Sequence, residues 1–512
     1  MRILILFLSG ILAALPLVIP QLAAIAWVSV TPLIYIIFKS DKPYRHGLVW
    51  SIGYYGVLYY WFIYLYPLDF AGLSNGQSVV LVMVAWIGMA MMQSLELAFV
   101  PFLFKKINKS RSNLTSVFLF PALWVIIEWF QTLTWTGVPW GRIAVSQYKV
   151  LPNIQITSIL GSLFLSFLII LVNSFLAFGC IKSDKRKKYA VIALAIYVVN
   201  VLFGCVSILS YSDSGEPIKA ALIQGNIASG QKWAEDSLAF SVDRYMTLSR
   251  QAIDEYDPDI IVWPETVITA AILYNNNYYE IQEFARSTET VLIFGTYNLV
   301  YNEEIDDYDT YNAIVTFNSD GKHIRQPYHK RHLVPFGEYV PMKSVIKLLV
   351  PVLSELNSYF EDDLMQGTDP AVGKTALGKI GYLICFDSIY ETLTTDTVRD
   401  GAEIIALSTN DSWYRDSAAV YQHNGHAVLR AVESGRYIMR AANTGVSSII
   451  RADGRILNYL DPLVEGNVYG EVYMRTNRTV YSYVGNLIVW VAIGYVVGCG
   501  GYALFEKSCA KA

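Results

Sequence analysis

The sequence predicts a polytopic α-helical membrane domain of about eight spans that carries an extracytoplasmic α/β domain. Hydrophobic residues make up 54% of the 512 residues and charged residues 16%, whereas a soluble domain carries roughly 25% charged residues. The long apolar runs are concentrated before residue 210, and one more lies near the end of the chain. Between them, short apolar strands alternate with helical stretches, which is typical of a layered α/β domain.

The same composition excludes several classes of protein. The formal net charge of −4 gives no indication of bulk nucleic-acid binding. The apolar content excludes a disordered chain. The five cysteines show no CxxC or Cys/His spacing, which excludes zinc fingers and iron–sulfur proteins.

Eight apolar runs come close to the ~20 residues that cross a hydrocarbon core of ~30 Å. They lie at 3–20, 21–38, 47–66, 79–104, 114–131, 156–180, 189–210 and 483–505. The run at 114–131 contains Glu128 and is the least regular of them. The alternative for the first run is a cleaved signal peptide, but only Arg2 precedes it and further spans follow at once.

Basic residues predict the orientation of these spans. With the N-terminus in the cytoplasm, the inside segments carry the basic clusters at 39–45, 105–111, 182–188 and 507–511. The short outside loops carry only Arg142 and Lys149. By the positive-inside rule both termini are cytoplasmic and the long segment between the last two spans lies outside the cytoplasm.

That long segment supplies the predicted α/β domain. Continuous apolar runs, typical of strands buried on both faces, lie at 220–224, 260–263, 291–295, 382–385 and 404–408. Helical periodicity covers about 234–256 and 418–437. We therefore divide the chain into an N-terminal membrane domain at 1–212, the α/β domain at 213–480, and a C-terminal span with a short tail at 481–512.

Three residues at the ends of predicted strands are candidates for catalysis. Cys385 is the only cysteine of the α/β domain, and the functional interpretation is a nucleophile exposed at the end of its strand. Glu265 follows Pro264, where strand pairing stops, at the edge at which α/β folds place their sites. Lys330 opens an irregular segment that ends at Glu338 and Pro341.

Each of these residues also has a purely structural interpretation. Cys385 could be a buried core residue, Glu265 an exposed residue that opens a loop, and the segment from Lys330 a charged surface loop. As a catalytic set they make chemical sense. A cysteine thiol with an ordinary pKa of ~8.5 needs a carboxylate to take its proton. A nearby ammonium then favours the thiolate and stabilises an oxyanion.

The sequence resembles a known family at several motifs. Glu265, Lys330 and Cys385 are similar to the Glu–Lys–Cys triad of the nitrilase, or carbon–nitrogen hydrolase, superfamily. The whole chain resembles that superfamily's membrane branch, the apolipoprotein N-acyltransferases. The matching motifs are Pro139-Trp140, Ser146-Gln147, Gly225-Asn226-Ile227 with Trp233, Trp263-Pro264-Glu265, the segment from Lys330 to Glu338, the segment from Thr409 to Trp413, Gln422-His423, the segment from Arg430 to Arg436, and Asn443-Thr444-Gly445.

The resemblance implies a nitrilase-like sandwich for the α/β domain and a ping-pong acyl transfer. Cys385 is then the nucleophile, Glu265 the general base and Lys330 the oxyanion stabiliser, with support from Glu338 and Asp387. Roles in positioning substrate are implied for Trp233, Phe386 and Trp413. The family usually reads Cys-Tyr-Glu at the nucleophile, whereas this chain reads Cys385-Phe386-Asp387, so its second carboxylate is one methylene shorter.

The resemblance also implies the substrates and the place of action. The sn-1 acyl chain of a phospholipid, phosphatidylethanolamine or phosphatidylglycerol, passes through a Cys385 thioester to the free α-amine of a diacylglyceryl-modified apolipoprotein. This is the last step of lipoprotein maturation, and it needs no cofactor and no metal. The implied location is the bacterial cytoplasmic (inner) membrane, with the catalytic domain on the periplasmic side.

Two other functions use the same features. A membrane-anchored amidase or nitrilase would use the triad to hydrolyse a small C–N bond. A transporter or lipid-binding protein would carry an inactive α/β domain, although the spans lack the cluster of interior charges that transport sites use. A further expectation concerns the apolar run at 345–356, which either packs in the α/β domain or lies on the membrane surface as a lid over the site.

Overall fold

The structure is a computed structural model that describes residues 1–68, 73–108, 114–133, 136–232, 237–275, 277–324, 327–343, 363–368 and 372–509. The chain forms two compact units. The helical unit comprises Met1–Tyr66, Val79–Tyr211 and Thr479–Ala512, and the α/β unit comprises Pro67–Ser78 and Ser212–Arg478. Trp233 and the run at 345–356 lie outside the described residues.

The helical unit is built from apolar helices joined by short connections. Its α-helices are α1 (Arg2–Val18), α2 (Ala26–Ser29), α3 (Thr31–Phe38), α4 (Pro43–Leu58), α5 (Asn75–Leu97), α6 (Phe99–Ile107), α7 (Leu114–Phe130), α8 (Leu151–Ile154), α9 (Thr157–Ile181), α10 (Arg186–Leu209), α18 (Val480–Val484) and α19 (Leu487–Cys509). Five 3₁₀ segments supplement them within the described residues: η1 (Pro20–Ile25), η2 (Tyr60–Leu65), η4 (Pro139–Gly141), η5 (Ile143–Gln147) and η6 (Ser183–Lys185). Helix α9 is broken at Gly161, whose φ is +78°.

Several of these segments are long and apolar enough to cross a membrane. Within the described residues they are Pro20–Phe38, Pro43–Leu65, Asn75–Ile107, Thr157–Ile181 and Ser183–Leu209. Arg2–Val18, Leu114–Phe130 and Leu487–Ala503 are apolar but shorter. A membrane domain of several helices is therefore confirmed, while the number of eight spans and their topology stay predictions.

The surface and interior of the helical unit suit a lipid environment. On α10, Val191, Leu194 and Val199 are each more than 60% exposed, which water would penalise and lipid does not. Glu128 on α7 is 4% exposed and accepts hydrogen bonds from Trp124 Nε1 at 2.9 Å and from the backbone N–H of Ile143 at 3.0 Å. The one carboxylate predicted inside that run thus faces the protein interior.

The α/β unit is a sandwich of two sheets with helices outside both. Its strands are β1 (Ile218–Gln224), β2 (Ile260–Val262), β3 (Ile268–Ala271), β4 (Val291–Asn302), β5 (Asp307–Phe317), β6 (Tyr328–His329), β7 (Val372–Lys374), β8 (Lys379–Ile384), β9 (Ile404–Thr409), β10 (Ile438–Ala442), β11 (Ser447–Ile450), β12 (Ile456–Leu460) and β13 (Gly466–Val472). Its helices are α11 (Ser229–Lys232), α12 (Ser237–Tyr256), α13 (Asn277–Ser287), α16 (Glu391–Arg399) and α17 (Ala418–Ser434), with 3₁₀ segments η7 (Ile272–Tyr274) and η9 (Cys385–Ile389).

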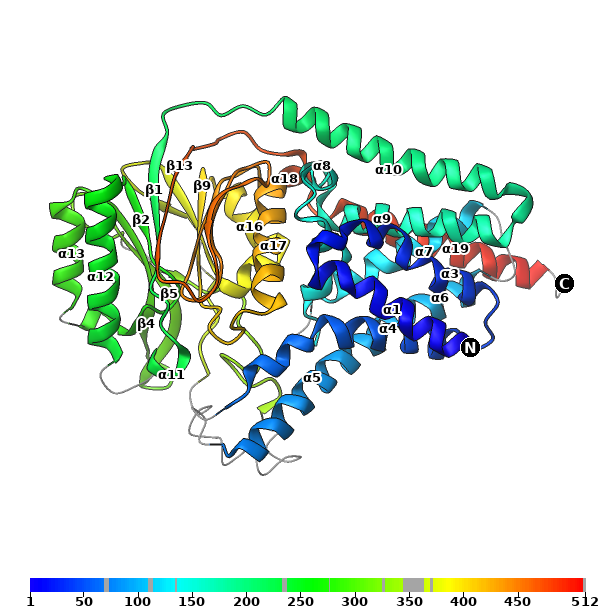
Figure 1. The fold of residues 1–512 in the computed structure, drawn as a ribbon, viewed down its shortest axis with the longest axis horizontal. Coiled ribbons are helices and arrows are strands. Elements are labelled where there is room, and N and C mark those ends of the chain that lie inside the picture. Colours follow the sequence, from blue (N-terminus) through cyan, green and yellow to red (C-terminus); the bar gives the residue numbers. More distant parts are fainter. Residues whose placement is uncertain are drawn as a thin grey trace. The chain divides into compact units, whose positions relative to one another are not determined.

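Strand order explains where the site is formed. In the described part of the chain, one sheet runs β13-β1-β2-β4-β5-β6 with β3 beside β4, and the other runs β12-β11-β10-β9-β8-β7. Strands β1, β2 and β4 are parallel, as are β8, β9 and β10. Helices α12 and α13 cover one sheet, and α16 and α17 cover the other (Figure 1). The carboxyl ends of the inner strands of both sheets therefore supply the residues of the site.

The five predicted strands and both predicted helices are confirmed. Each apolar run coincides with β1, β2, β4, β8 or β9, and their side chains are almost all buried, as strands covered on both faces require. The helix predicted at 418–437 ends earlier, at Ser434, because Gly435 adopts φ +64° and caps it.

Candidate active site

Glu265 stands just beyond the carboxyl end of β2. Trp263 still pairs with β4 through its N–H to the Ile293 carbonyl at 2.8 Å, and the Pro264 carbonyl accepts the Gly295 N–H at 3.1 Å. A Cβ on Gly295 would lie 2.6 Å from the Cα of Glu265, so only glycine allows the chain to turn past β4 here. The Glu265 side chain is buried, which makes the interpretation as an exposed loop residue wrong.

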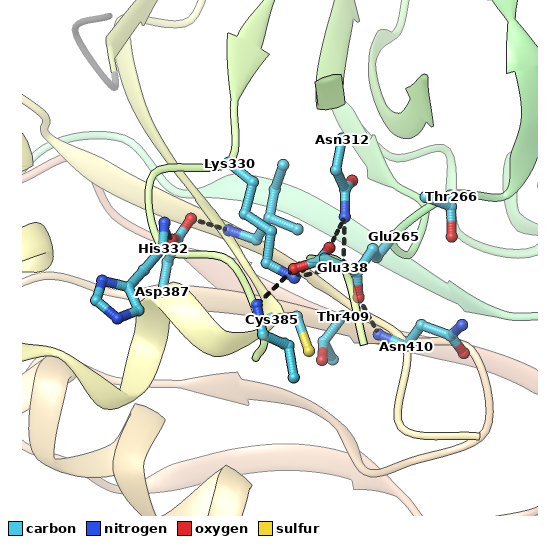
Figure 2. Close-up of polar contacts among 12 residues, drawn as sticks. Glu265, Thr266, Asn312, Lys330, His332, Glu338, Cys385, Asp387, Thr409 and Asn410 are labelled. Carbon is cyan, nitrogen blue, oxygen red and sulfur yellow. Dashed lines mark hydrogen bonds and ion pairs between the residues drawn. The ribbon is translucent and has the colours of Figure 1, made fainter. Parts of the chain in front are cut away.

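Lys330 follows β6 and lies between two carboxylates (Figure 2). Its Nζ is 3.0 Å from Oε1 of Glu265 and 2.9 Å from Oε1 of Glu338. Asn312 on β5 donates from Nδ2 to the same two oxygens, at 2.7 and 2.8 Å. Lys330 is 1% exposed, so it does not belong to a surface loop. One ammonium and one amide together hold two buried carboxylates side by side.

Cys385 directly follows β8 and begins η9 with a backbone φ of +45°. This left-handed conformation costs a non-glycine residue about 1–2 kcal/mol, and such strain is typical of a sharp strand-to-helix turn that presents a nucleophile. Figure 2 shows its sulfur on the side of Lys330 and Thr409. The position at the strand end is confirmed. The expected exposure is wrong, because the residue is only 7% exposed.

Asp387 connects the nucleophile turn to the strand that carries Lys330. Its Oδ2 accepts the Ile384 N–H at 3.0 Å and the Tyr328 hydroxyl at 2.8 Å, and its Oδ1 accepts the His332 N–H at 2.8 Å. Tyr328 and His332 lie two residues before and two residues after Lys330. The Asp387 carboxylate therefore links the two sheets next to Lys330. Burial raises the pKa of Asp387 to about 6, with Lys330 opposing that shift.

Burial and charge together set the resting protonation of the site. Burial raises the pKa of the Cys385 thiol well above its ordinary value, and the Glu265 carboxylate raises it further. Burial alone would also raise the pKa of Glu265, but the Lys330 ammonium holds it below its ordinary value. Against the effect of burial, Glu265 and Glu338 hold the pKa of Lys330 well above its usual range. The resting site thus contains a charged Glu265 carboxylate, a charged lysine and a neutral thiol.

Three polar groups at the site carry no role in the sequence analysis. Asn312 lies within the apolar pattern of β5, and nothing in that pattern distinguishes it. The backbone N–H of Asn410, directly after β9, donates to Oε2 of Glu265 at 2.9 Å. Lys232 is buried and donates from Nζ to the Glu265 carbonyl at 3.2 Å and to Thr266 Oγ1. Burial lowers the pKa of Lys232 to about 8, against the attraction of Glu265.

The residues assigned to substrate positioning differ in placement. Phe386 is 5% exposed, and its ring lies 6.1 Å from that of His332 and 5.6 Å from that of Tyr390. Trp413 is half-buried beyond β9. Trp233 cannot be placed, because it lies outside the described residues. Their contacts with substrate stay a prediction.

One group of potential metal ligands lies next to the nucleophile. Within the described ranges, ligand atoms of Cys385, Asp411 and His423 lie within 4.8 Å of one another. Both carboxylate oxygens of Asp411 are already bonded, Oδ1 to His423 Nδ1 at 2.8 Å and Oδ2 to Arg440 Nη2 at 2.7 Å. A divalent cation here would face the Arg440 guanidinium, so these residues fit an internal ion pair better than a metal site.

We expect the Asp387 tether to be sensitive to both charge and length. Asp387→Asn places an amide N–H against the three groups that donate to the carboxylate. Because Lys330 then shifts away from the turn, acyl-enzyme formation should fall by roughly 10–100-fold. Asp387→Glu adds a methylene to a fully buried site, which typically costs ~1–3 kcal/mol. Mass spectrometry of the acyl adduct on Cys385 measures both effects.

Asp387→Glu is the more informative of these two variants. Glutamate is the residue that the similar family usually has at this position. Near-normal activity would show that the site accepts either length and would contradict a tether fitted to Asp387. An exposed matched control is Asp320→Asn. Asp320 pairs with Lys322 at the surface, and this variant should leave the adduct unchanged.

Two family models match the chain. The model of the carbon–nitrogen hydrolases matches residues 219–480, which is just over half of the chain. The model described as the apolipoprotein N-acyltransferase N-terminal domain matches residues 9–175. The first match covers most of the α/β unit, and the second lies mostly in the helical unit. The two matches thus account for both parts of the chain.

Several apolipoprotein N-acyltransferases are similar to this chain over three quarters or more of their own length. The apolipoprotein N-acyltransferase of Geobacter metallireducens is 30% identical over 98% of this chain and 95% of its own length. That of Shewanella oneidensis is 29% identical over 77% of this chain and 75% of its own. Among solved structures, Nit3 of Saccharomyces cerevisiae, a member of branch 10 of the nitrilase superfamily, is 20% identical and covers 53% of this chain and 96% of its own, with a TM-score of 0.39.

Proposed function

The chain belongs to the apolipoprotein N-acyltransferase family, and we propose that Cys385, Glu265 and Lys330 carry out its acyl transfer. The protein is a multi-pass membrane acyltransferase that N-acylates lipoproteins and draws the acyl chain from phospholipid. The observation that carries the catalytic assignment is the shared lysine: Lys330 bonds Glu265 and Glu338 at once, next to a cysteine held at positive φ.

The first half-reaction forms a thioester. The Sγ of Cys385 attacks the sn-1 ester carbonyl of phosphatidylethanolamine or phosphatidylglycerol, while Glu265 takes the thiol proton. Lys330 stabilises the tetrahedral oxyanion, a contribution that is typically ~10²–10³-fold for one donor. When the intermediate collapses, the ester C–O bond breaks and Glu265 returns the proton to the leaving lysophospholipid. Cys385 keeps the acyl group.

The second half-reaction transfers the acyl group to nitrogen. The free α-amine of a diacylglyceryl-modified apolipoprotein attacks the thioester carbonyl, and Glu265 takes a proton from that nitrogen. Lys330 again stabilises the oxyanion. The C–S bond breaks, the thiolate takes the proton from Glu265, and the amide product leaves. Glu338 and Asn312 act on neither substrate, but both keep Lys330 and Glu265 at bonding distance throughout.

Glu265→Gln is expected to reduce acyl-enzyme formation by about 10²–10⁴-fold, the usual contribution of a general base. The thiol is neutral at rest because burial raises its pKa, so a base is needed for attack. The lowered pKa of Glu265 keeps the base charged. The wild-type rate of acyl-enzyme formation should therefore have no pH dependence from Glu265 between about pH 6 and 8. Quench-flow measurement of the adduct at several pH values checks both statements.

The matched control for that variant is Glu283→Gln. Glu283 is a surface carboxylate on α13 that pairs with Arg286, and its side chain is 58% exposed. This variant should acylate as the wild type does. Retention of a rapid, pH-independent adduct in Glu265→Gln would remove Glu265 from the mechanism.

The membrane side of the site is also part of the proposal. Residues 1–212 and 481–512 form the membrane domain with both termini in the cytoplasm, and 213–480 form the catalytic domain on the periplasmic side. The bias of basic residues toward the inside segments supports this orientation. Bacterial lipoproteins carry their modified amine at the outer face of the inner membrane, where such a domain would meet it.

A single accessible cysteine reports this topology in a cysteine-free background. A thiol at Ile305, which is 59% exposed at the end of the β4–β5 hairpin, should react with a membrane-impermeant reagent in whole spheroplasts. A thiol at Asp184 should react only after lysis. The reverse labelling pattern would place the catalytic domain in the cytoplasm. It would contradict the proposal that this domain meets lipoproteins at the outer face of the membrane.

One assay separates the transferase from the amidase alternative. Purified protein is mixed with phospholipid vesicles and a synthetic diacylated lipopeptide, and the products are read by mass spectrometry. The expected result is one further acyl chain on the peptide amine and one lysophospholipid per turnover. Release of free fatty acid with an unmodified peptide, together with hydrolysis of small amides, would favour the amidase.

A further inference from the structure

A buried lysine that the catalytic steps do not use lies behind the proposed general base. Lys232 is the last residue of α11 and is 4% exposed. Its Nζ donates to the backbone carbonyl of Glu265 at 3.2 Å and to Thr266 Oγ1. Figure 2 shows the Thr266 side chain on the side of Glu265 away from Lys330. One lysine therefore holds the Glu265 carboxylate, and the other holds the backbone of the same residue.

The backbone that Lys232 holds is strained. Thr266 has a φ of +46°, a left-handed conformation that β-branched residues rarely adopt. The turn also presses against β4, because a Cβ on Gly295 would lie 2.5 Å from the Thr266 nitrogen. A strained conformation persists only where the surrounding contacts hold it in place. The two hydrogen bonds from Lys232 supply such contacts where the chain leaves β2 and presents Glu265.

The segment that carries Lys232 is fixed to the second sheet by Asn443, which directly follows β10. The Asn443 carbonyl accepts the Asn226 N–H at 2.9 Å. Its side chain accepts the Ile227 N–H at 3.0 Å and donates to the Ile227 carbonyl at 2.7 Å. These contacts join the motifs Gly225-Asn226-Ile227 and Asn443-Thr444-Gly445, to which the catalytic steps assign no role.

Asn443 also reaches the general base from the other side. Its Nδ2 donates to Asn410 Oδ1 at 3.2 Å, and the Asn410 N–H donates to Oε2 of Glu265 at 2.9 Å. The contacts thus form a closed path that runs from Lys232 through Glu265, Asn410 and Asn443 back to the segment before α11. Glu265 is held within this path by its backbone and by its carboxylate.

The charge of Lys232 also acts on Glu265. A buried ammonium is costly unless its charge is compensated, and within the described ranges no carboxylate forms an ion pair with Lys232. Burial lowers the pKa of Lys232 to about 8, against the attraction of Glu265 and then of Cys385, so the ammonium form prevails at pH 7. Burial would raise the pKa of Glu265, but Lys330 and then Lys232 hold it below its ordinary value.

We propose that Lys232 is a positioning residue, which holds the turn that presents Glu265 and places a second positive charge behind that carboxylate. This role rests on the proposed function of Glu265 as the general base. Lys232 acts through Glu265, because its bonds go to the backbone of that residue and to the residue that follows. Without it the turn relaxes, and a displacement of about 1 Å is enough to slow a reaction about 10²-fold.

The test is a double-mutant cycle between Lys232→Met and Glu265→Gln in the full-length protein. Methionine keeps an unbranched apolar side chain and removes the charge and the N–H groups. Vesicles of phosphatidylethanolamine and phosphatidylglycerol supply the acyl chain, and mass spectrometry after quenching measures the adduct on Cys385. A series of vesicle concentrations gives the maximal rate and the half-saturating phospholipid concentration. The matched control is Lys374→Met, at an exposed lysine on β7, which should acylate as the wild type does.

The cycle distinguishes an action through Glu265 from a general structural role. Lys232→Met alone should lower the maximal rate about 10–100-fold and leave the half-saturating concentration unchanged. In the Glu265→Gln background it should change the rate by less than about threefold, because the base is already lost. Equal fold losses in both backgrounds, or a wild-type rate in Lys232→Met, would overturn the positioning role. Glu265→Gln alone tests the general base, so the two failures are distinguishable.

Thr266→Val keeps the test decisive if Lys232→Met does not fold. Valine has the shape and the β-branching of threonine, so it removes one acceptor of Lys232 and keeps the ammonium. The maximal rate should fall about 3–10-fold, as expected for one hydrogen bond, and the loss should disappear in the Glu265→Gln background. A wild-type rate in Thr266→Val, or the same loss in both backgrounds, would contradict the proposed hold on this turn.

Discussion

Cys385→Ala is expected to abolish acyl transfer, with a loss of about 10⁴-fold or more, as for the removal of a nucleophile in other covalent enzymes. Cys385 is the only cysteine of the α/β unit, since Cys180, Cys205, Cys499 and Cys509 belong to the helical unit. Wild-type protein incubated with phospholipid alone should carry a hydroxylamine-labile acyl group on Cys385, since the first half-reaction needs no acceptor. The variant should carry none.

Two further variants sharpen this result. Cys385→Ser supplies a poorer nucleophile, and it should form no adduct or an oxygen ester that hydroxylamine removes far more slowly than a thioester. Cys180→Ala is the matched control, because Cys180 is exposed at the end of α9. A Cys385→Ala protein that still transfers acyl chains at the wild-type rate would refute the proposed mechanism.

The strand-end positions of the site were predictable from local sequence. Continuous apolar runs that stop at Pro264 or before Asp387 mark strands buried on both faces, and parallel strands present their carboxyl ends together. Residues placed by such runs, Glu265 and Cys385, therefore lie where the sequence predicts. Their burial was not predictable, because it depends on two sheets packing face to face.

The contacts that link the two sheets were not predictable for the same reason, although the resemblance implies a supporting role for Asp387. Asp387 touches groups from β6 and β8, and Asn410 reaches Glu265 across the sandwich. Neither contact leaves a periodic signal in the sequence, since the partners are separated by tens of residues and lie on different sheets. Asn312 is an example. Its polar side chain can be recognised in the sequence of the strand, but the two carboxylates that it contacts cannot.

In the helical unit, the lengths of the helices could not be predicted from the sequence. Composition identifies apolar runs well, but it does not show where a helix breaks. Gly161 interrupts α9 and Pro121 lies within α7, so helical segments and apolar runs need not have the same length. The helix Leu114–Phe130 is apolar apart from Thr115, Ser116 and Glu128, but it is shorter than a full span.

Lys330→Met is expected to reduce acyl-enzyme formation by about 10³-fold or more, because it removes two contributions at once. The oxyanion loses its cation. Glu265, which lies beside Glu338 on the shared Asn312 amide, loses the cation that keeps its pKa low, and burial then favours its protonated form. Glu265 then no longer serves as a base.

The same variant should be less stable in a pH-dependent way. Removing one partner of a buried ion pair typically costs ~3–5 kcal/mol. Without Lys330, burial raises the folded-state pKa of Glu265 above the unfolded value, so protonation of Glu265 favours the folded protein. The destabilisation should therefore be largest at neutral and alkaline pH and should shrink as the pH falls toward the carboxylate range. Thermal unfolding of the purified protein at several pH values measures this.

A double variant separates the loss of stability from the loss of chemistry. Lys330→Met with Glu338→Gln removes one negative charge together with the positive one, so much of the stability at neutral pH should return. Activity should not return, because the oxyanion still has no ammonium to stabilise it. Lys322→Met, at a lysine whose side chain is 84% exposed, should change neither property. If the double variant transfers acyl chains at the wild-type rate, Lys330 serves only to hold the carboxylates and the proposed oxyanion role is wrong.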